Sequence, residues 1–395
     1  FRGVTETPHS LAPTVPHSAF AAFQMMFAVI TPALIAGAFA ERVRFGGYVL
    51  FVALWSLIVY APVAHWVWGG GFLGVDGIGA LDFAGGTVVH ISAGAAALAA
   101  ALYVGGRRGF PRGNFAPHNV PMVVLGAGIL WFGWFGFNAG SALGASGLAS
   151  SAFLATHLGA AGAMIGWLVP ERLRHGKATA VGGATGAVAG LVAITPAAGF
   201  VAPLPALTIG LIAGMVCFAA VELKSRLGYD DSLDAVGVHM VGGLAGALLT
   251  GVFASLAVNP AGADGGWMQI GRQGAAAGIT LVFSFAATWV ILTLVDRLVG
   301  FRMPADAEDV GVDLAEHGES AYAFREHGRQ ATPSIASMTE DELAEMRERL
   351  VLDATARVLE AIEASGDDRT VAARRRVERP MDLIRSSAVF RRRRG

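Results

Sequence analysis

Charged residues are scarce in this chain of 395 residues, since Asp, Glu, Lys and Arg make up 15% of it while hydrophobic residues make up 54%. Soluble globular proteins carry about 25% charged residues. The composition therefore excludes an ordinary soluble domain and indicates a polytopic membrane protein. Cysteine is almost absent, and the single Cys217 excludes an internal disulfide and a cysteine-built metal site. The formal net charge of −1 gives no indication of nucleic-acid binding, and none is expected.

Long apolar runs are the main feature that is present. A run of about 20 apolar residues crosses a bilayer as a helix, whereas a membrane β-barrel needs alternating segments of about ten residues. The runs are continuous and hold no Lys or Arg in their interiors, so we expect an all-α fold with nine spans. The spans are predicted at residues 17–40, 47–68, 83–104, 119–140, 148–169, 179–200, 203–223, 234–257 and 273–296.

Basic residues are unevenly distributed among the loops. They follow the first, third, fifth, seventh and ninth predicted spans, for example at Arg42, Arg107, Lys177, Lys224 and Arg302. Loops rich in Lys and Arg stay in the cytoplasm. We therefore expect a multi-pass protein of the cell membrane with its N-terminus outside and its C-terminus in the cytoplasm.

The charge distribution also divides the chain into parts. Residues 1–16 are expected to be an extracellular segment and residues 17–300 the transmembrane domain. Residues 325–395 form an extension with one predicted amphipathic helix and a basic end, "FRRRRG". That end is either a solvated tail or a contact for anionic lipid.

Small residues recur at four-residue spacing within the predicted spans. Gly182, Gly186 and Gly190 form one such face, and a second begins at Gly243. Faces of this kind allow helix backbones to approach closely in lipid. A phosphate-binding loop is excluded because no Gly-Lys-Ser/Thr ends these runs.

Two spans begin alike, although the charge rule makes them enter the membrane from opposite sides. They are "LDFAGGTVVHISAGAAAL" (81–98) and "LDAVGVHMVGGLAGALL" (233–249). Related segments of opposite orientation indicate an inverted repeat, with the substrate path near its axis.

Each of the two segments carries one histidine. His90 lies about 12 Å beyond Asp82 along a helix, and His239 lies about 7 to 8 Å beyond Asp234. The imidazoles can therefore meet near mid-membrane, or each can bond separately to a backbone carbonyl. Asp82 and Asp234 are expected to have structural roles. Asp82 is expected to cap the N-terminus of its helix, and direct substrate binding is the alternative role.

A facing histidine pair suits a small neutral substrate that forms hydrogen bonds. Zinc would need a third protein ligand, and a hydrolase would need a nucleophile at a matching position. We therefore expect no metal, no cofactor and no enzymatic activity.

Further motifs resemble those of the ammonium transporter (Amt/Mep/Rh) family, specifically its Amt branch, in order and spacing over roughly residues 18–324. The family has an inverted-repeat fold of eleven spans, and the first span here resembles its third, so about two N-terminal spans are expected to be missing. Residues 301–324 resemble the family's cytoplasmic tail. The motifs are "FAERVRF" (39–45), "AHWVWGGG" (64–71), "LDFAGGTVVHI" (81–91), "APHNVPM" (116–122), "GWFGFNAGSA" (133–142), "ITPAAGF" (194–200), "DDSLDAVGVHMVGG" (230–243) and "GVDLAEHGESAY" (311–322).

The resemblance implies a role for several aromatic residues. Trp68 and Ser141, with Phe27 beneath them, resemble the family's outer ammonium site, although an interfacial belt position is an alternative for Trp68. Phe27 and Phe137 resemble the stacked gate of the family. Trp134 resembles a pore-lining residue, and the two histidines resemble the family's pair.

The implied function is transport of ammonium or ammonia, with methylammonium as an analogue, through a lipid bilayer. The resemblance further implies a homotrimer and a PII-type regulatory protein at the cytoplasmic face. The alternative function is an ammonium sensor that signals through the C-terminal tail.

Overall fold

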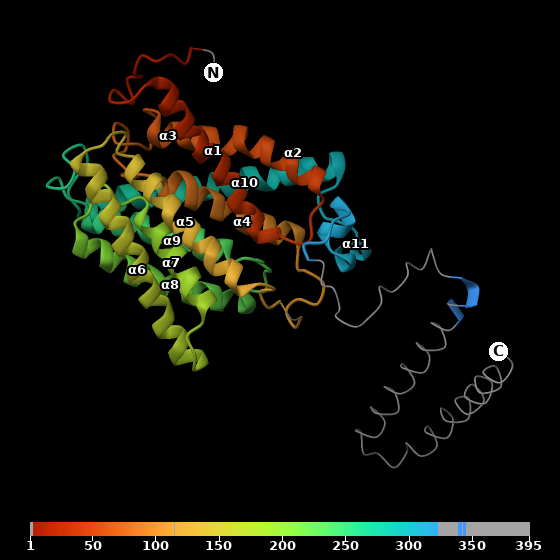
Figure 1. The fold of residues 1–395 in the computed structure, drawn as a ribbon. Coiled ribbons are helices and arrows are strands. Elements are labelled where there is room, and N and C mark those ends of the chain that lie inside the picture. The colour runs from red at the N-terminus through yellow and green to blue at the C-terminus, as the bar shows by residue number, and fades with distance from the viewer. Residues whose placement is uncertain (1–2, 114, 323–338, 342, 345–395) are drawn as a thin grey trace. The chain divides into compact units, whose positions relative to one another are not determined.

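Long apolar helices run side by side through residues 17–299 (Figure 1). The structure is a computed structural model, and it describes residues 3–113, 115–322, 339–341 and 343–344. The chain divides into two units, Phe1–Ala321 and Tyr322–Gly395, and nearly all described residues belong to the first. The expected amphipathic helix and basic end of residues 325–395 lie outside the described residues, apart from a few positions at 339–344.

Three π-helical segments continue directly into α-helices of the first unit. In chain order the helical elements are α1 (His17–Phe39), α2 (Phe45–Trp55), η1 (Ser56–Tyr60), α3 (Ala61–Trp68), η2 (Gly86–Ile91), α4 (Ser92–Val104), α5 (Val120–Gly140), α6 (Gly147–His175), α7 (Ala180–Ile194), α8 (Pro203–Leu227), η3 (Val236–Met240), α9 (Val241–Phe253), α10 (Trp267–Val299), α11 (Ala305–Val310) and η4 (Asp313–His317).

Eight helical stretches of the described residues are long and apolar enough to cross a membrane. They coincide with eight of the nine predicted spans, which confirms the all-α membrane fold. The remaining prediction, 179–200, differs because α7 has only 15 residues. Pro196, which has no backbone N–H to donate to a further helical turn, follows it, and the chain turns there. Since α7 is buried along most of its length, it needs no lipid-facing surface that matches the bilayer thickness.

Close packing around α6 confirms the predicted small-residue face. A Cβ atom on Gly190 would lie 2.4 Å from the carbonyl oxygen of Gly159, and one on Gly186 would lie 2.6 Å from the Cβ of Trp167. Helix α8 approaches α6 in the same way, because a Cβ atom on Gly210 of α8 would lie 2.1 Å from the same Gly159 oxygen. Real Cβ contacts are longer than this, so α7 and α8 can approach α6 only because these positions are glycine.

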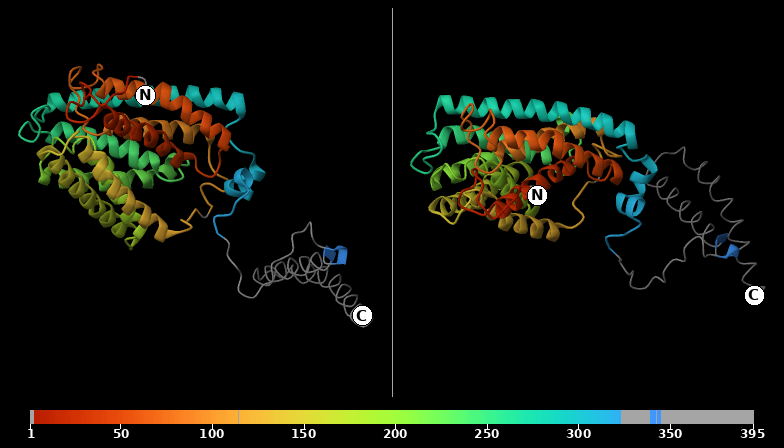
Figure 2. Two further views of the ribbon diagram at one scale, coloured as in Figure 1. Left: turned by 45° about the horizontal axis from the view of Figure 1, so that its top comes forward. Right: turned by 90° about the horizontal axis from the view of Figure 1, so that it is seen from above.

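Helix α4 lies inside the helical body and is buried along most of its length, while α5 is largely exposed. Figure 2 shows α10 running along the whole body on one side. The continuous stretch η2–α4 joins the two ends of this body. We call the end near the start of η2 the Trp68 face, because Trp68 bonds to Asp82 there, and the other end the Arg42 face.

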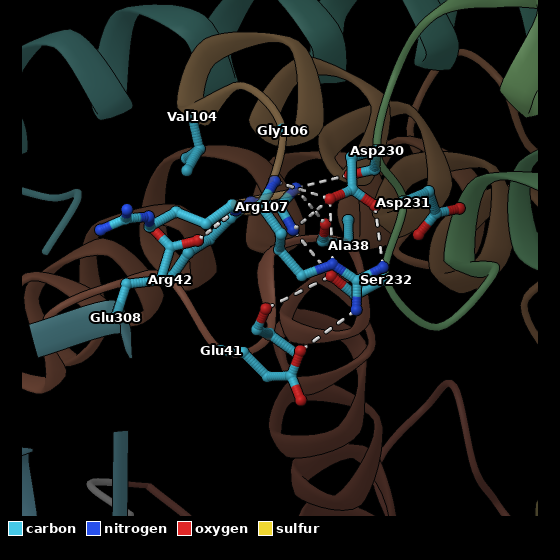
Figure 3. Close-up of polar contacts among 12 residues, drawn as sticks. Ala38, Glu41, Arg42, Val104, Gly106, Arg107, Asp230, Asp231, Ser232 and Glu308 are labelled. Carbon is cyan, nitrogen blue, oxygen red and sulfur yellow. Dashed lines mark hydrogen bonds and ion pairs between the residues drawn. The ribbon is translucent and has the colours of Figure 1, made fainter. Parts of the chain in front are cut away.

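An ion cluster at the Arg42 face joins segments that are far apart in the sequence. Figure 3 shows Arg42 and Arg107 converging on Asp230. The side chain of Arg107 donates to both carboxylate oxygens of Asp230 at 2.9 Å, and its backbone N–H donates at 2.8 Å. Arg42 is fully buried and donates to Ser232 at 2.7 Å and to the Ala38 carbonyl at 2.9 Å.

Electrostatics favour the ionised form of Asp230 in this cluster. Burial by itself would raise the pKa of the Asp230 carboxyl, but the hydrogen bonds from Arg107 and the charge of Arg42 outweigh it and hold that pKa below its ordinary value. The cluster therefore fastens the loops after α1 and α4 to the segment that precedes η3.

The segment after α10 returns to the same face. Arg302 donates to the Val104 carbonyl at 2.6 Å and to Glu308 at 3.0 Å. Farther along, Glu316 accepts a hydrogen bond from the Phe45 backbone at 3.2 Å, and the His317 ring lies 5.0 Å from the Phe45 ring. Residues 301–317 thus contact the C-terminal end of α4 and the start of α2.

Candidate functional site

A cavity of about 450 Å³ opens at the Trp68 face. Phe27, Trp68 and Ser141, the three residues predicted for an outer site, all line it. The Ser141 hydroxyl donates to the Phe137 carbonyl at 2.8 Å, so its oxygen lone pairs stay available to accept an N–H. The Trp68 indole N–H donates to the Asp82 carbonyl at 2.9 Å, which fixes the plane of the ring.

Aromatic rings lead inward from this cavity in unbroken contact. The Phe27 ring lies 5.3 Å from Trp68 and 4.6 Å from Phe137, and Phe27 is only 2% exposed. Phe137 lies 5.2 Å from Trp134, and both rings lie nearly parallel to His90. Phe27 and Phe137, the two rings predicted to form a stacked gate, are in contact, but their planes are tilted by 59° rather than stacked.

The two histidines meet in the interior. Nδ1 of His90 and Nδ1 of His239 are 3.2 Å apart, so one donates and the other accepts a hydrogen bond. Both side chains are buried, and Nε2 of His90 has no hydrogen-bond partner among the described residues. Trp134 is fixed against His90 by a 2.9 Å hydrogen bond from its indole to Thr195. The two imidazoles therefore pair with each other, and neither needs the separate carbonyl considered as the alternative.

Asp82 caps the helix that carries His90. Its carboxylate accepts four backbone N–H groups, from Gly85, Gly86, Thr87 and Val88, at 2.6 to 3.0 Å. Burial raises the pKa of Asp82, and these four donors act against that rise. Both carboxylate oxygens therefore accept hydrogen bonds from the start of η2. This favours the predicted capping role over substrate binding.

Asp231 caps the helix of the other histidine, and the sequence prediction missed it. Its carboxylate accepts from the backbone N–H groups of Ala235 and Val236 at 3.0 and 2.7 Å. Burial and the carboxylate of Asp234 raise the pKa of Asp231 to about 7. The signal was available in the sequence, because Asp82 and Asp231 both stand eight positions before their histidine.

The predicted pairing of Asp82 with Asp234 in the repeat is therefore wrong. Asp234 occupies the place of Gly85: both residues have positive φ, 61° and 122°, just before their helices begin. The Asp234 carboxylate bonds instead to Lys224. Its structural role stays a prediction, but its contact is with a neighbouring helix.

The two capped helices cross at matching glycines. A Cβ on Gly94 would lie 2.3 Å from the Met240 backbone nitrogen, and one on Gly243 would lie 3.1 Å from the Cβ of His90. Each glycine stands four positions after its own histidine. Since η2 starts at the Trp68 face and η3 starts beside the Arg42 cluster, the helices enter from opposite ends, as an inverted repeat requires.

We predict that Asp82→Asn lowers the free energy of unfolding by about 2 kcal/mol, because an amide offers one acceptor oxygen and no charge to the four N–H donors. Denaturant titration in detergent micelles measures this. The matched control is Asp76→Asn, since Asp76 lines the same cavity but is exposed. Equal stability of the two variants would contradict the capping role.

Comparison with known proteins places this arrangement in a family. The model of the Ammonium Transporter Family matches residues 4–322. The chain belongs to the ammonium transporter family. It is a multi-pass membrane protein of a family of transporters rather than enzymes.

Individual relatives agree with this assignment. The chain is 51% identical to an ammonium transporter of Mycobacterium tuberculosis strain H37Rv, over 80% of this chain and 69% of that protein. It is 50% identical to an ammonium transporter of Bacillus subtilis strain 168, over 81% and 80% of the two chains. The crystal structure of Candida albicans Mep2 matches with a TM-score of 0.70 and 38% identity, over 75% of this transporter and 69% of Mep2. A solved structure described as a "Sensor Amt Protein" matches with a TM-score of 0.71 and 33% identity, over 78% of this transporter and 79% of that chain.

Proposed function

We propose that this transporter takes up ammonium at the Trp68 cavity and conducts ammonia past the paired histidines to the Arg42 face. The observation that supports it best is the unbroken series of rings from Trp68 through Phe27 and Phe137 to His90. A cation over aromatic faces gains about 1 kcal/mol, and more where it is desolvated. The Ser141 oxygen can accept one of the ammonium N–H groups.

Deprotonation at the gate follows from the surroundings of Phe27: the ammonium ion passes its proton to water in the open Trp68 cavity, and ammonia continues inward. Beyond this ring the path is lined by aromatic rings and imidazoles that offer few oxygens, so a bare cation loses its water without replacement. Ammonia has no charge and can pass, whereas potassium cannot shed a proton and is excluded. Nε2 of His90, which has no hydrogen-bond partner in the part of the chain that the structure describes, supplies a hydrogen-bonding group along the way.

The Trp68 face would lie outside the cell and the Arg42 face in the cytoplasm. The basic residues gathered at the Arg42 face, Arg42, Arg107 and Arg302 among them, support this orientation. A homotrimer and a PII-type regulatory partner at the Arg42 face belong to the same proposal on the strength of the family resemblance. Native mass spectrometry in detergent should show a three-chain species.

The test uses proteoliposomes that contain this chain and a pH-sensitive dye. An imposed ammonium gradient should alkalinise the lumen faster than in protein-free liposomes if ammonia enters alone through the protein, and should give an inward current if the proton follows. Either signal supports conduction and states the stoichiometry. Absence of both signals from correctly folded protein would overturn the proposal and favour the second candidate function, an ammonium sensor. The similarity to the "Sensor Amt Protein" structure supports this second candidate.

We predict that Trp68→Leu raises the KM for labelled methylammonium about fivefold, because the lost cation–π attraction is worth about 1 kcal/mol. The matched control is Trp66→Leu on the same helix, since the Trp66 ring packs against Phe72 and Phe283 at 5.3 and 4.7 Å. Its KM should stay unchanged. Equal KM values in the two variants would remove Trp68 from the substrate site.

A further inference from the structure

Gln273 is a buried amide on the largely apolar helix α10. It is 1% exposed, and its side chain forms a two-point contact with the backbone of Leu81. Its Oε1 accepts from the Leu81 N–H at 2.6 Å, and its Nε2 donates to the Leu81 carbonyl at 2.7 Å. The same Nε2 lies 3.2 Å from the Ala247 carbonyl of α9. A buried amide is costly unless its groups are paired, so this geometry fixes Leu81 firmly to α10.

Leu81 immediately precedes Asp82, which contacts both Trp68 of the cavity and the helix that carries His90. The Asp82 carbonyl accepts the indole N–H of Trp68, and the Asp82 carboxylate caps the helix that carries His90. The position of the Asp82 backbone therefore sets the plane of the Trp68 ring and the start of η2 together. Gln273 holds that backbone from the residue before it.

A second glutamine supports the same loop. Gln269, one helical turn before Gln273, donates to the Gly79 carbonyl at 2.9 Å and to Oε1 of Gln273 at 3.3 Å. It is 2% exposed. Residues 79–82 have no regular secondary structure of their own, so these two amides supply contacts that a helix or strand would otherwise provide.

We infer that Gln273 is a positioning residue for ammonium affinity: it acts through Leu81 and Asp82 to hold Trp68 in the orientation that binds the cation. The inference rests on the proposed function of the Trp68 cavity. It assigns to α10, which contributes no residue to the lining of that cavity, a part in substrate affinity.

The test is the KM for labelled methylammonium in proteoliposomes of Gln273→Met, a variant of similar length without hydrogen-bonding groups. We expect KM to rise about fivefold, as for Trp68→Leu, while Vmax changes by less than twofold. The matched control is Thr288→Val, because Thr288 is also buried on α10 and accepts a hydrogen bond from Trp55 at 2.9 Å, away from the loop. Its KM should stay at the wild-type value.

The double variant Gln273→Met with Trp68→Leu separates positioning from general destabilisation. If Gln273 acts through Trp68, the double variant should have the KM of Trp68→Leu alone. Multiplication of the two effects to about 25-fold, or a rise in the KM of Thr288→Val equal to that of Gln273→Met, would overturn the inference.

Two outcomes keep the inference distinct from the proposed function. Absence of saturable uptake in the wild type overturns the proposed function, whereas a KM that responds to Trp68→Leu but not to Gln273→Met overturns only the inference. If Gln273→Met does not fold, the KM of Gln269→Met tests the inference instead. It removes the Gly79 contact and should raise KM about twofold, and an unchanged KM would count against the role of the two glutamines.

Discussion

Replacing His90 by alanine should lower the maximal rate of methylammonium uptake by about fivefold to a hundredfold while leaving KM within about twofold of the wild type. The substitution leaves Nδ1 of His239 buried without its partner 3.2 Å away. Loss of one partner of a buried hydrogen bond costs about 1–3 kcal/mol, and each 1.4 kcal/mol added to a barrier is a factor of about ten in rate. KM should hold because Trp68 and Ser141 lie at the entrance, outside the altered segment.

The control for this experiment is His157→Ala. His157 lies on a membrane-spanning helix, α6, but its ring packs 5.3 Å from Trp131 and its side chain is exposed. Uptake by His157→Ala should match the wild type. Unaltered uptake by His90→Ala would mean that the substrate takes another path through the protein.

The second large effect concerns stability at the Arg42 face. Asp230→Ala should lower the free energy of unfolding by about 3–5 kcal/mol, the cost of leaving a buried charge without its partner. Asp230 is 1% exposed, Arg42 is fully buried 3.5 Å from it, and Arg107 binds both of its oxygens. Denaturant titration in detergent micelles measures the change.

Asp309→Ala is the matched control, because Asp309 pairs with Arg108 while both side chains are about half exposed. Exposed pairs contribute about 0–1 kcal/mol, so this variant should remain near wild type. The contribution of Asp230 also depends on pH. Its pKa is lower in the folded protein than the ordinary 3.8, so the contribution is fully present above that value and is lost as the pH falls through the folded-state pKa. Equal stability of the two variants at neutral pH would contradict the role of the cluster.

The sequence was sufficient to predict the spans and the meeting of the histidines. A continuous apolar run is a local signal, so eight spans were predicted close to their observed positions. The histidine pair was predictable because both copies of the repeat carry the residue. The short α7 was not predicted: Pro196 marks its end in the sequence, but that a helix of 15 residues is long enough here depends on its burial against α6 and its neighbours, which no local pattern records.

Roles that depend on partners far away in the sequence could not be predicted from the sequence. Arg42 was predicted only as a basic loop residue, yet it is fully buried and bonds to the Asp230 carbonyl, 188 positions away. Gln273 contacts Leu81 across 192 positions. Asp231 is different, since the eight-residue spacing to His239 was visible, but the shared Leu-Asp pair led to the choice of Asp234.

The most direct test of ammonium conduction is competition during uptake of labelled methylammonium into proteoliposomes of this chain. The aromatic entrance and the oxygen-poor path predict saturable uptake that ammonium inhibits and that an equal concentration of potassium leaves unchanged. Uptake that potassium inhibits as strongly as ammonium would contradict discrimination by deprotonation at the Phe27 gate.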